Sequence, residues 1–194
     1  MNKILWVDLD EVLAETVDEV LKFNNYTVKW QAIYKDDISD YYISNISKYN
    51  LIRDDAINFF WSVLNSPARE NILPVKWAKE KLLGLKNNWR KIVVVTARRE
   101  EISEYTKSWL NRFYPWLIED ILFANHFSEN EIPKSKLCKE NWIKIMIEDN
   151  LDFSMELATF WIKVYLLDKP WNRHYNPLIH LWVHKINDWS EISL

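Results

Sequence analysis

Glycine is almost absent from this chain of 194 residues, in which Gly84 is the only one. Glycine-rich phosphate-binding loops need several glycines at fixed spacing, because glycine lets the backbone turn tightly and approach a phosphate closely. The sequence therefore excludes both a Walker A motif and a dinucleotide-binding fingerprint. A phosphate ligand must be bound by another kind of site.

Cysteine, long apolar runs and an excess of one charge are lacking as well. The single cysteine, Cys138, excludes an intrachain disulfide and fits a reducing, cytoplasmic setting. No apolar run approaches the roughly 20 residues of a membrane-spanning helix, and Asp8 and Asp10 interrupt the N-terminal run, unlike a signal peptide. With 25 basic and 28 acidic residues the formal net charge is −3. We therefore expect a cytoplasmic protein that binds neither a nucleic acid polymer nor a membrane.

Tryptophan, by contrast, is abundant, with 12 residues. We interpret these side chains as large amphipathic fillers of the core and of surface grooves. The chain is 48% hydrophobic and 27% charged, which is typical of a globular protein. Its length suits one domain with a modest insertion.

Short apolar runs rich in β-branched residues recur along the chain and end in polar or acidic residues. Nearly continuous runs of this kind are typical of strands buried on both faces of a parallel sheet. They predict five strands, at 3–7, 91–95, 121–124, 143–147 and 162–167. Helical patterns lie between them, at 100–113, 134–141 and 151–160. The alternation predicts an α/β fold with a doubly wound, mainly parallel five-stranded sheet.

The interval between the first two predicted strands is far longer than a crossover needs. It is aromatic and mostly helical in pattern, with a turn at 36–42 and a helix at 54–64. We predict a small helical cap at 16–73, inserted after the first strand into a core domain formed by 1–15 and 74–194. A helix at 75–85 would lead back into the second strand.

Candidate catalytic residues follow the predicted strands. They are Asp8 and Asp10 after the first strand, Thr96 and Arg98 after the second, and Glu148 and Asp149 after the fourth. Ligands of open α/β sheets bind outside the carboxyl ends of the strands, so these distant segments are expected to converge. So many acids need a cation beside them, and oxygen ligands without His or Cys indicate Mg²⁺.

Four segments resemble the signature motifs of the haloacid dehalogenase (HAD) superfamily of phosphohydrolases, in the same order and over nearly the whole chain. They are WVDLDEVLAET, VVVTAR, PKSKLCKE and IMIEDN. Together with DKPWNR at 168–173, they resemble most the 5'(3')-deoxyribonucleotidase-like branch. The resemblance implies a HAD-like Rossmannoid fold and a Mg²⁺-dependent phosphomonoester hydrolase that works through an aspartyl-phosphate.

The resemblance also implies roles for individual side chains. Asp8 would attack phosphorus, and Asp10 would protonate the leaving oxygen and then activate water. Thr96 would donate to a phosphoryl oxygen, and Lys134 would offset charge on the nucleophile and the phosphoryl group. The predicted substrate-binding residues are Thr96, Ala97, Arg98 and Lys134.

For the metal, the resemblance implies the side chain of Asp8, the backbone carbonyl of Asp10 and the acidic pair Glu148–Asp149. Glu148 stands where Asp is commoner in the superfamily, so either acid of the pair can be the direct ligand. Glu11 stands where the superfamily usually has glycine. This departure leaves the local turn open, because glutamate does not adopt the glycine conformations readily.

Each signal has a simpler interpretation when it stands alone. A DxD pair is more often a solvated turn, and Thr96 could cap a helix. Lys136 is an alternative to Lys134 as the motif lysine. Arg98 could bind phosphate or be a surface charge. The pair Trp171–Asn172 could shape the rim of a pocket or be a turn packed by its tryptophan.

The aromatic residues of the predicted cap could stack a nucleobase or form the cap's own core. They are Phe23, Tyr26, Tyr41, Tyr42, Phe59, Phe60 and Trp61. We predict a small phosphorylated substrate, a nucleoside monophosphate, and a 5'-nucleotidase or 5'(3')-deoxyribonucleotidase activity. The alternatives are a phosphatase of another small phosphorylated metabolite and a non-catalytic Mg²⁺-binding regulatory module.

Overall fold

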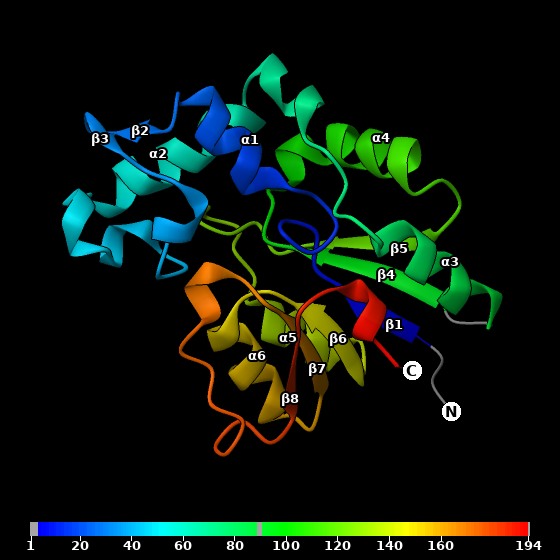
Figure 1. The fold of residues 1–194 in the computed structure, drawn as a ribbon. Coiled ribbons are helices and arrows are strands. Elements are labelled where there is room, and N and C mark those ends of the chain that lie inside the picture. Colours follow the sequence, from blue (N-terminus) through cyan, green and yellow to red (C-terminus); the bar gives the residue numbers. More distant parts are fainter. Residues whose placement is uncertain (1–3, 89–90, 194) are drawn as a thin grey trace.

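The computed structural model describes residues 4–88 and 91–193, so Lys3, the first residue of the first predicted strand, lies outside the described residues. Within these ranges six strands form one sheet in the order β5-β4-β1-β6-β7-β8 (Figure 1). Every neighbouring pair in it is parallel. The strands are β1 (Ile4–Val7), β4 (Lys91–Thr96), β5 (Ile118–Phe123), β6 (Ile145–Glu148), β7 (Lys163–Leu167) and β8 (Val183–Ile186).

Strand β8 was not predicted, so the expected number of five strands is wrong by one. Its sequence, VHKI, is short, and its middle residues His184 and Lys185 are polar. It lies at the edge of the sheet, where its neighbour is β7. The five predicted runs all form strands. Four of them are central strands, which buried β-branched residues mark clearly, and the fifth, β5, forms the other edge of the sheet.

Helices cover both faces of the sheet (Figure 1). Leu5 and Val7 of β1 share one buried cluster with Trp109, on the face covered by α3 (Ala78–Asn87) and α4 (Ser103–Phe113). Trp6 points the other way, into a cluster beneath α5 (Lys134–Glu140) and α6 (Leu151–Ala158). The alternation follows from the two-residue period of a strand and produces the predicted doubly wound, three-layered α/β fold.

The predicted helices are present with shifted ends. The predicted helix at 100–113 begins as a 3₁₀ turn, Glu100–Ile102, and continues as α4. The predicted helix at 75–85 is α3, which begins three residues later, after Trp77. None of the helices within 4–88 and 91–193 has the length and apolar character needed to cross a bilayer.

Residues 16–73, which we call the cap, contain two helices, α1 (Thr16–Phe23) and α2 (Arg53–Leu64). They also contain a small hairpin of β2 (Thr27–Val28) and β3 (Gln31–Ala32), which the helical pattern did not predict. The two chain segments that join the cap to the core domain lie side by side: Glu15 donates to Leu73 O and Val75 donates to Leu13 O, both at 2.8 Å. The cap boundaries themselves stay a prediction.

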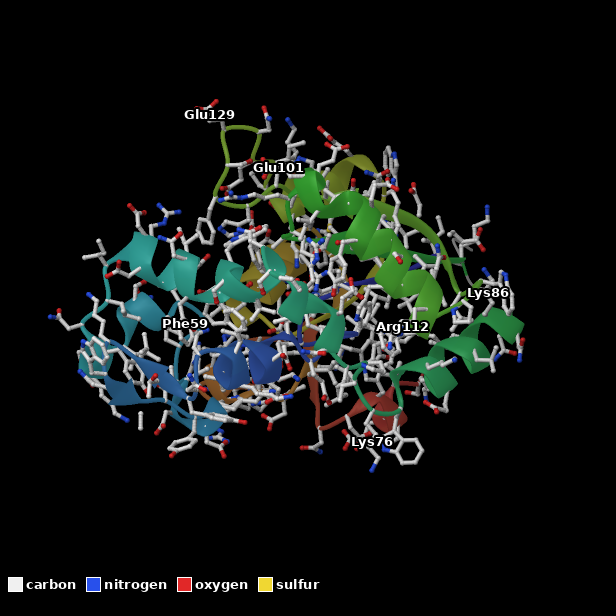
Figure 2. The ribbon with its side chains drawn as sticks, turned by 90° about the horizontal axis from the view of Figure 1, so that it is seen from above. Phe59, Lys76, Lys86, Glu101, Arg112 and Glu129 are labelled. Carbon is white, nitrogen blue, oxygen red and sulfur yellow. The ribbon has the colours of Figure 1, made fainter. Side chains whose placement is uncertain are left out.

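The cap lies beside the carboxyl ends of β1 and β4 (Figure 1). Seen from above, its helices lie next to α4, with Phe59 labelled on the cap and Arg112 on α4 (Figure 2). The indole N–H of Trp109 in α4 donates to Ile72 O at 2.9 Å, which fixes the end of the cap against this helix.

Left-handed backbone is frequent in this glycine-poor chain. In the described ranges twelve residues other than glycine have positive φ, and five of them are tryptophans. These five are exposed: Trp30, Trp77, Trp116, Trp142 and Trp161. The interpretation of tryptophan as a filler is therefore wrong for them, although it holds for the buried Trp6, Trp109, Trp171 and Trp189. Trp89 lies outside the described residues.

Candidate active site

The order of the sheet reverses at β1, which lies between β4 and β6. The chain leaves neighbouring strands in opposite directions at such a point, and a crevice opens beyond their carboxyl ends. Three of the predicted site residues lie at this edge of the sheet. Asp8 directly follows β1, Thr96 ends β4 and Glu148 ends β6.

Three carboxylates converge in this crevice. One oxygen each of Asp8, Glu148 and Asp149 lies within 4.8 Å of the other two, and all three residues are buried. No His or Cys belongs to this group in the described part of the chain. The sequence prediction thus names side chains that the fold brings together. The carboxylate of Asp10 does not belong to this group. The prediction for Asp10 was that its backbone carbonyl, and not its side chain, binds the metal.

Lys134, at the start of α5, lies between two of these acids. Its Nζ is 2.5 Å from Asp8 Oδ1 and 3.2 Å from Glu148 Oε2, and the side chain is buried. Lys136 is exposed and lies 4.0 Å from Glu140. Of the two lysines that the sequence left open, the structure places Lys134 at the acid cluster.

Burial and mutual repulsion raise the pKa values of two acids in the cluster. Burial, with the charge of Glu148, raises the pKa of Asp8 to about 8, although Lys134 works to lower it. Burial and the charges of Glu148 and Asp8 raise the pKa of Asp149 well above its usual range. A divalent cation would let all three acids ionise, and a donor set of carboxylate oxygens fits a hard ion such as Mg²⁺.

Asp10 is held by Arg98 and Thr16. Arg98 Nη2 donates to Asp10 Oδ1 at 2.8 Å and Nε donates to Oδ2 at 3.1 Å, while the Thr16 hydroxyl donates to the same carboxylate. Burial works to raise the pKa of Asp10, but the Arg98 guanidinium outweighs it, so this pKa is lowered. Arg98 is buried, so the alternative of a surface charge is wrong; a contact with phosphate stays a prediction.

Thr96 ends β4, and Ala97 begins the loop that follows it. Thr96 is fully buried, and its Oγ1 accepts a hydrogen bond from the backbone N–H of Arg98 at 3.1 Å. A hydroxyl that accepts one hydrogen bond still has a hydrogen to donate, as the predicted contact with a phosphoryl oxygen requires. Ala97 lines the cavity beside Asp10 and accepts from the backbone N–H of His126 at 3.0 Å.

Trp171 and Asn172 support Asp149 from the turn Pro170–Asn172. The Trp171 indole donates to Asp149 Oδ2 at 2.8 Å, and Asn172 Nδ2 donates to the Asp149 carbonyl at 2.8 Å. Both residues are buried, and Trp171 also lines the cavity. Trp171 and Asn172 thus form a packed turn whose tryptophan also lines the cavity, so both interpretations of this pair from the sequence apply. Their contact with Asp149 was not predicted, and the DKPWNR segment was the only feature of the sequence that pointed to this turn.

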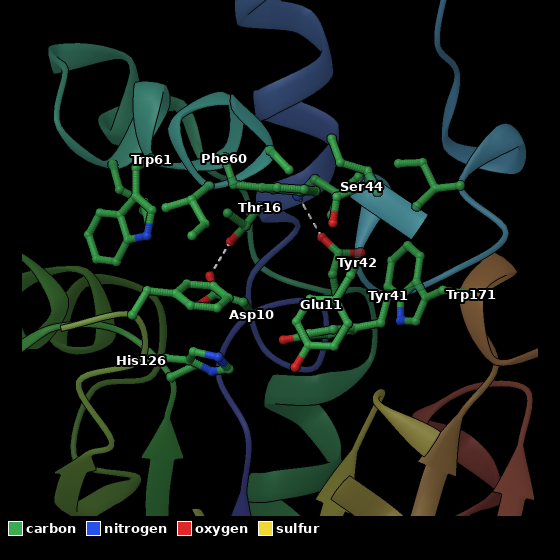
Figure 3. Close-up of a pocket in the computed structure, with 18 of the residues that line it drawn as sticks. Asp10, Glu11, Thr16, Tyr41, Tyr42, Ser44, Phe60, Trp61, His126 and Trp171 are labelled. Carbon is green, nitrogen blue, oxygen red and sulfur yellow. Dashed lines mark hydrogen bonds between the residues drawn. The ribbon is translucent and has the colours of Figure 1, made fainter. Parts of the chain in front are cut away.

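A cavity of about 170 Å³ opens beside Asp10 and Asp149 (Figure 3). Four of the predicted aromatic cap residues line it: Tyr41, Tyr42, Phe60 and Trp61. The core domain adds His126, Phe127 and Trp171 to the wall. The other aromatic cap residues lie elsewhere: Phe59 is buried among apolar side chains, and Phe23 and Tyr26 are exposed. A concave site with a largely aromatic wall and a few acidic groups at one end suits a small molecule.

No protein-family model and no curated protein matches the sequence. Solved structures match the fold instead. A haloacid dehalogenase-like hydrolase from Streptococcus pneumoniae superposes with a TM-score of 0.64 and 14% identity, over 87% of this chain and 86% of that one. A HAD hydrolase of family IA, variant 3, from Entamoeba histolytica gives 0.61 and 13%, over 99% and 96%.

The fold is that of the HAD hydrolases. A predicted phosphoglycolate phosphatase from Haemophilus somnus shares it, with a TM-score of 0.60 and 13% identity over 97% of this chain and 95% of that one. The expectation of a HAD-like Rossmannoid fold is thereby confirmed. At these identities the likeness concerns the fold, and the chemistry depends on the residues of this chain.

Proposed function

We propose that this protein is a Mg²⁺-dependent phosphomonoester hydrolase with Asp8 as its nucleophile. The observation that carries the proposal is the meeting of Asp8, Glu148 and Asp149 within 4.8 Å, with Lys134 Nζ 2.5 Å from Asp8. Mg²⁺ held by these carboxylates and the Asp10 carbonyl would neutralise charge on the phosphoryl group and hold it in place.

Each residue of the site has a separate role in the proposed reaction. Asp8 attacks phosphorus and forms an aspartyl-phosphate while the bond to the leaving oxygen breaks. Asp10, which faces the cavity, takes a proton from the water that hydrolyses the intermediate, a role that suits a carboxylate whose pKa Arg98 lowers. To protonate the leaving oxygen in the first step, Asp10 must first bind a proton against this lowered pKa. Lys134 and the Thr96 hydroxyl stabilise the charge that develops on the phosphoryl oxygens. Arg98 and Thr16 hold Asp10 in place.

We further propose a nucleoside monophosphate as the substrate and a 5'-nucleotidase or 5'(3')-deoxyribonucleotidase activity. The cavity begins at Asp10, where the leaving oxygen departs, and the aromatic rings of Tyr41, Tyr42, Phe60 and Trp61 offer flat faces to a base. The resemblance of DLDEVLAET, VTAR and DKPWNR to the deoxyribonucleotidase-like branch supports the same substrate class.

Phosphate release from a panel of 5'- and 3'-nucleoside monophosphates, ribose and deoxyribose, tests the proposal in the presence of Mg²⁺. Asp8→Asn is expected to abolish release, and Lys136→Gln, an exposed change on the same helix as Lys134, to leave it unchanged. The proposal fails if the folded protein releases no phosphate from any phosphomonoester. If the protein is a non-catalytic Mg²⁺-binding module, the unchanged protein will release no phosphate either, so Asp8→Asn will make no difference.

A second candidate is a phosphatase of another small phosphorylated metabolite. It is supported by structural neighbours such as the predicted phosphoglycolate phosphatase. Adding phosphoglycolate and sugar phosphates to the same panel separates the two. Release from these compounds without release from any nucleotide would replace the nucleotidase by this second candidate.

A further inference from the structure

Glu11 combines two unfavourable features. Its φ is 62°, in the left-handed region that disfavours residues with a Cβ, and its carboxylate is buried with a side-chain exposure of 4%. Such a residue persists where its surroundings hold it firmly, and such places cluster at sites with a function. The contacts of its carboxylate show what this residue connects.

Glu11 contacts three segments. Oε1 accepts from the backbone N–H of Val17 at 2.7 Å, in the first turn of α1. Glu15, which precedes this helix, makes no side-chain capping bond among the described residues, so Glu11 caps the first helix of the cap. Oε2 lies 2.9 Å from Lys35 Nζ on the cap and 3.3 Å from Lys169 Nζ on the core domain.

A further ion pair lies at the same junction. Arg173 Nη2 of the core domain is 2.8 Å from Asp36 Oδ1 of the cap. The cap turn Lys35–Asp37 therefore docks against the core turn Pro170–Asn172. The first turn leads to Tyr41 in the cavity wall, and the second carries Trp171, which holds Asp149.

We propose that Glu11 is a positioning residue that holds the cap closed over the cavity by joining Lys35 of the cap to Lys169 of the core domain. Its negative charge lies between the two lysines, and Lys35 has a second acidic partner inside the cap, Asp18 Oδ2 at 2.7 Å. Without the charge of Glu11, Lys35 would keep its pair within the cap but lose its link to Lys169, and the cap would separate from the core turn. The consequence for substrates rests on the proposed function; the closure of the cap does not.

Hydrogen–deuterium exchange of the full chain, without Mg²⁺ or substrate, tests the closure directly. Glu11→Gln keeps the length of the side chain and an acceptor for Val17 but removes the charge, and Lys35→Gln removes its partner from the cap side. Both variants are expected to speed exchange in the segment 33–42 by about five- to tenfold. Lys29→Gln is the matched control, because the 2.8 Å pair of Lys29 with Asp55 lies within the cap.

The outcomes separate the alternatives. Faster exchange in Glu11→Gln and Lys35→Gln, with no change in Lys29→Gln, supports the proposal. Unchanged exchange in the first two variants overturns it. Faster exchange in Glu11→Gln alone also overturns it, since Glu11 would then support only its own turn. Lys35 is partly exposed, so its variant is expected to fold whatever happens at Glu11.

A kinetic experiment measures the effect on substrates. An open cap should weaken binding of a nucleotide, whose base reaches the cap, more than that of acetyl phosphate, whose leaving group is too small to reach it. For Glu11→Gln and Lys35→Gln we expect the KM of the nucleotide to rise about fivefold and that of acetyl phosphate to change less. Equal changes for both substrates would overturn the positioning role. If the parent protein hydrolyses no nucleotide, the proposed nucleotidase activity fails, and the exchange experiment still decides the role of Glu11.

Discussion

The indole N–H of Trp171 donates a hydrogen bond of 2.8 Å to Oδ2 of Asp149. Asn172, the next residue, binds the backbone carbonyl of the same aspartate at 2.8 Å. The orientation of an acid in the cluster is therefore set by the turn after β7 as well as by β6. Partners of this kind fix the direction in which a ligand atom points and tune its affinity for a metal.

Replacing Trp171 by Phe removes this hydrogen bond and keeps an aromatic ring in the cavity wall. We expect the affinity for Mg²⁺ to fall about tenfold, because Asp149 is then free to rotate. Isothermal titration calorimetry with Mg²⁺ measures this without substrate. Trp189→Phe is the control: it removes an equally buried indole N–H, bound to Val12 O at 2.9 Å. Equal Mg²⁺ affinities in the two variants would contradict the prediction.

Replacing Lys134 by Met removes the ammonium group that pairs with both Asp8 and Glu148, and leaves these two acids buried. Removing one partner of a buried ion pair costs about 3–5 kcal/mol, so the free energy of unfolding in EDTA should fall by this order. Saturating Mg²⁺ should recover part of the loss, and phosphate release should fall about 10²–10³-fold. Urea unfolding with and without Mg²⁺ measures the first effect. Lys136→Met, on the exposed face of α5, is expected to change neither quantity; a similar loss there would argue against a special role for Lys134.

The stability of the metal-free protein should depend on pH through Asp8. Burial, with the charge of Glu148, raises the pKa of Asp8 from 3.8 to about 8. The folded state therefore binds this proton more tightly than the unfolded state, and stability falls as the pH rises from about 4 to about 8. We expect the Tm in EDTA to decrease over this range, and to decrease less in Asp8→Asn. Equal slopes for the two proteins would show that Asp8 is not the group responsible.

Trp116 is 89% exposed and has a φ of 60°. A residue with a Cβ costs roughly 1–2 kcal/mol in this conformation, and glycine avoids the cost while losing more entropy on folding. We expect Trp116→Gly to raise the free energy of unfolding by about 0.5–1 kcal/mol. Gly84→Ala is the reverse comparison, since Gly84 lies within α3 with open space around the added methyl group, and it should stabilise by about 1 kcal/mol. Urea unfolding measures both, and a destabilised Trp116→Gly would contradict the first expectation.

Five exposed tryptophans occupy left-handed positions of this kind, in a chain with one glycine. Such positions favour glycine, and the codon UGA specifies tryptophan in some genetic codes and glycine in others. We therefore expect the protein isolated from its own cells to carry glycine at these positions: Trp30, Trp77, Trp116, Trp142 and Trp161. Peptide mass spectrometry distinguishes the two residues, and tryptophan in all five peptides would refute the expectation.

The sequence by itself determined the central strands and which acids stand at their ends. Runs such as Lys91–Thr96 are apolar and β-branched over their whole length, a local property that marks a strand buried on both faces. Asp8 and Glu148 each stand at the end of such a run, so the general rule for open α/β sheets was enough to bring them to one edge. The edge strand β8 lacked this local signal and was missed.

Only the tertiary structure decided which side chains meet. Arg98 and Asp10 are 88 residues apart, and their bidentate contact depends on the register of β4 against β1. Lys134 and Lys136 are both lysines at the start of one helix, but successive residues of a helix point in directions about 100° apart. The packing of α5 against the sheet turns Lys134 to the acids and Lys136 to solvent. Such choices depend on the relative placement of whole elements, which no local pattern encodes.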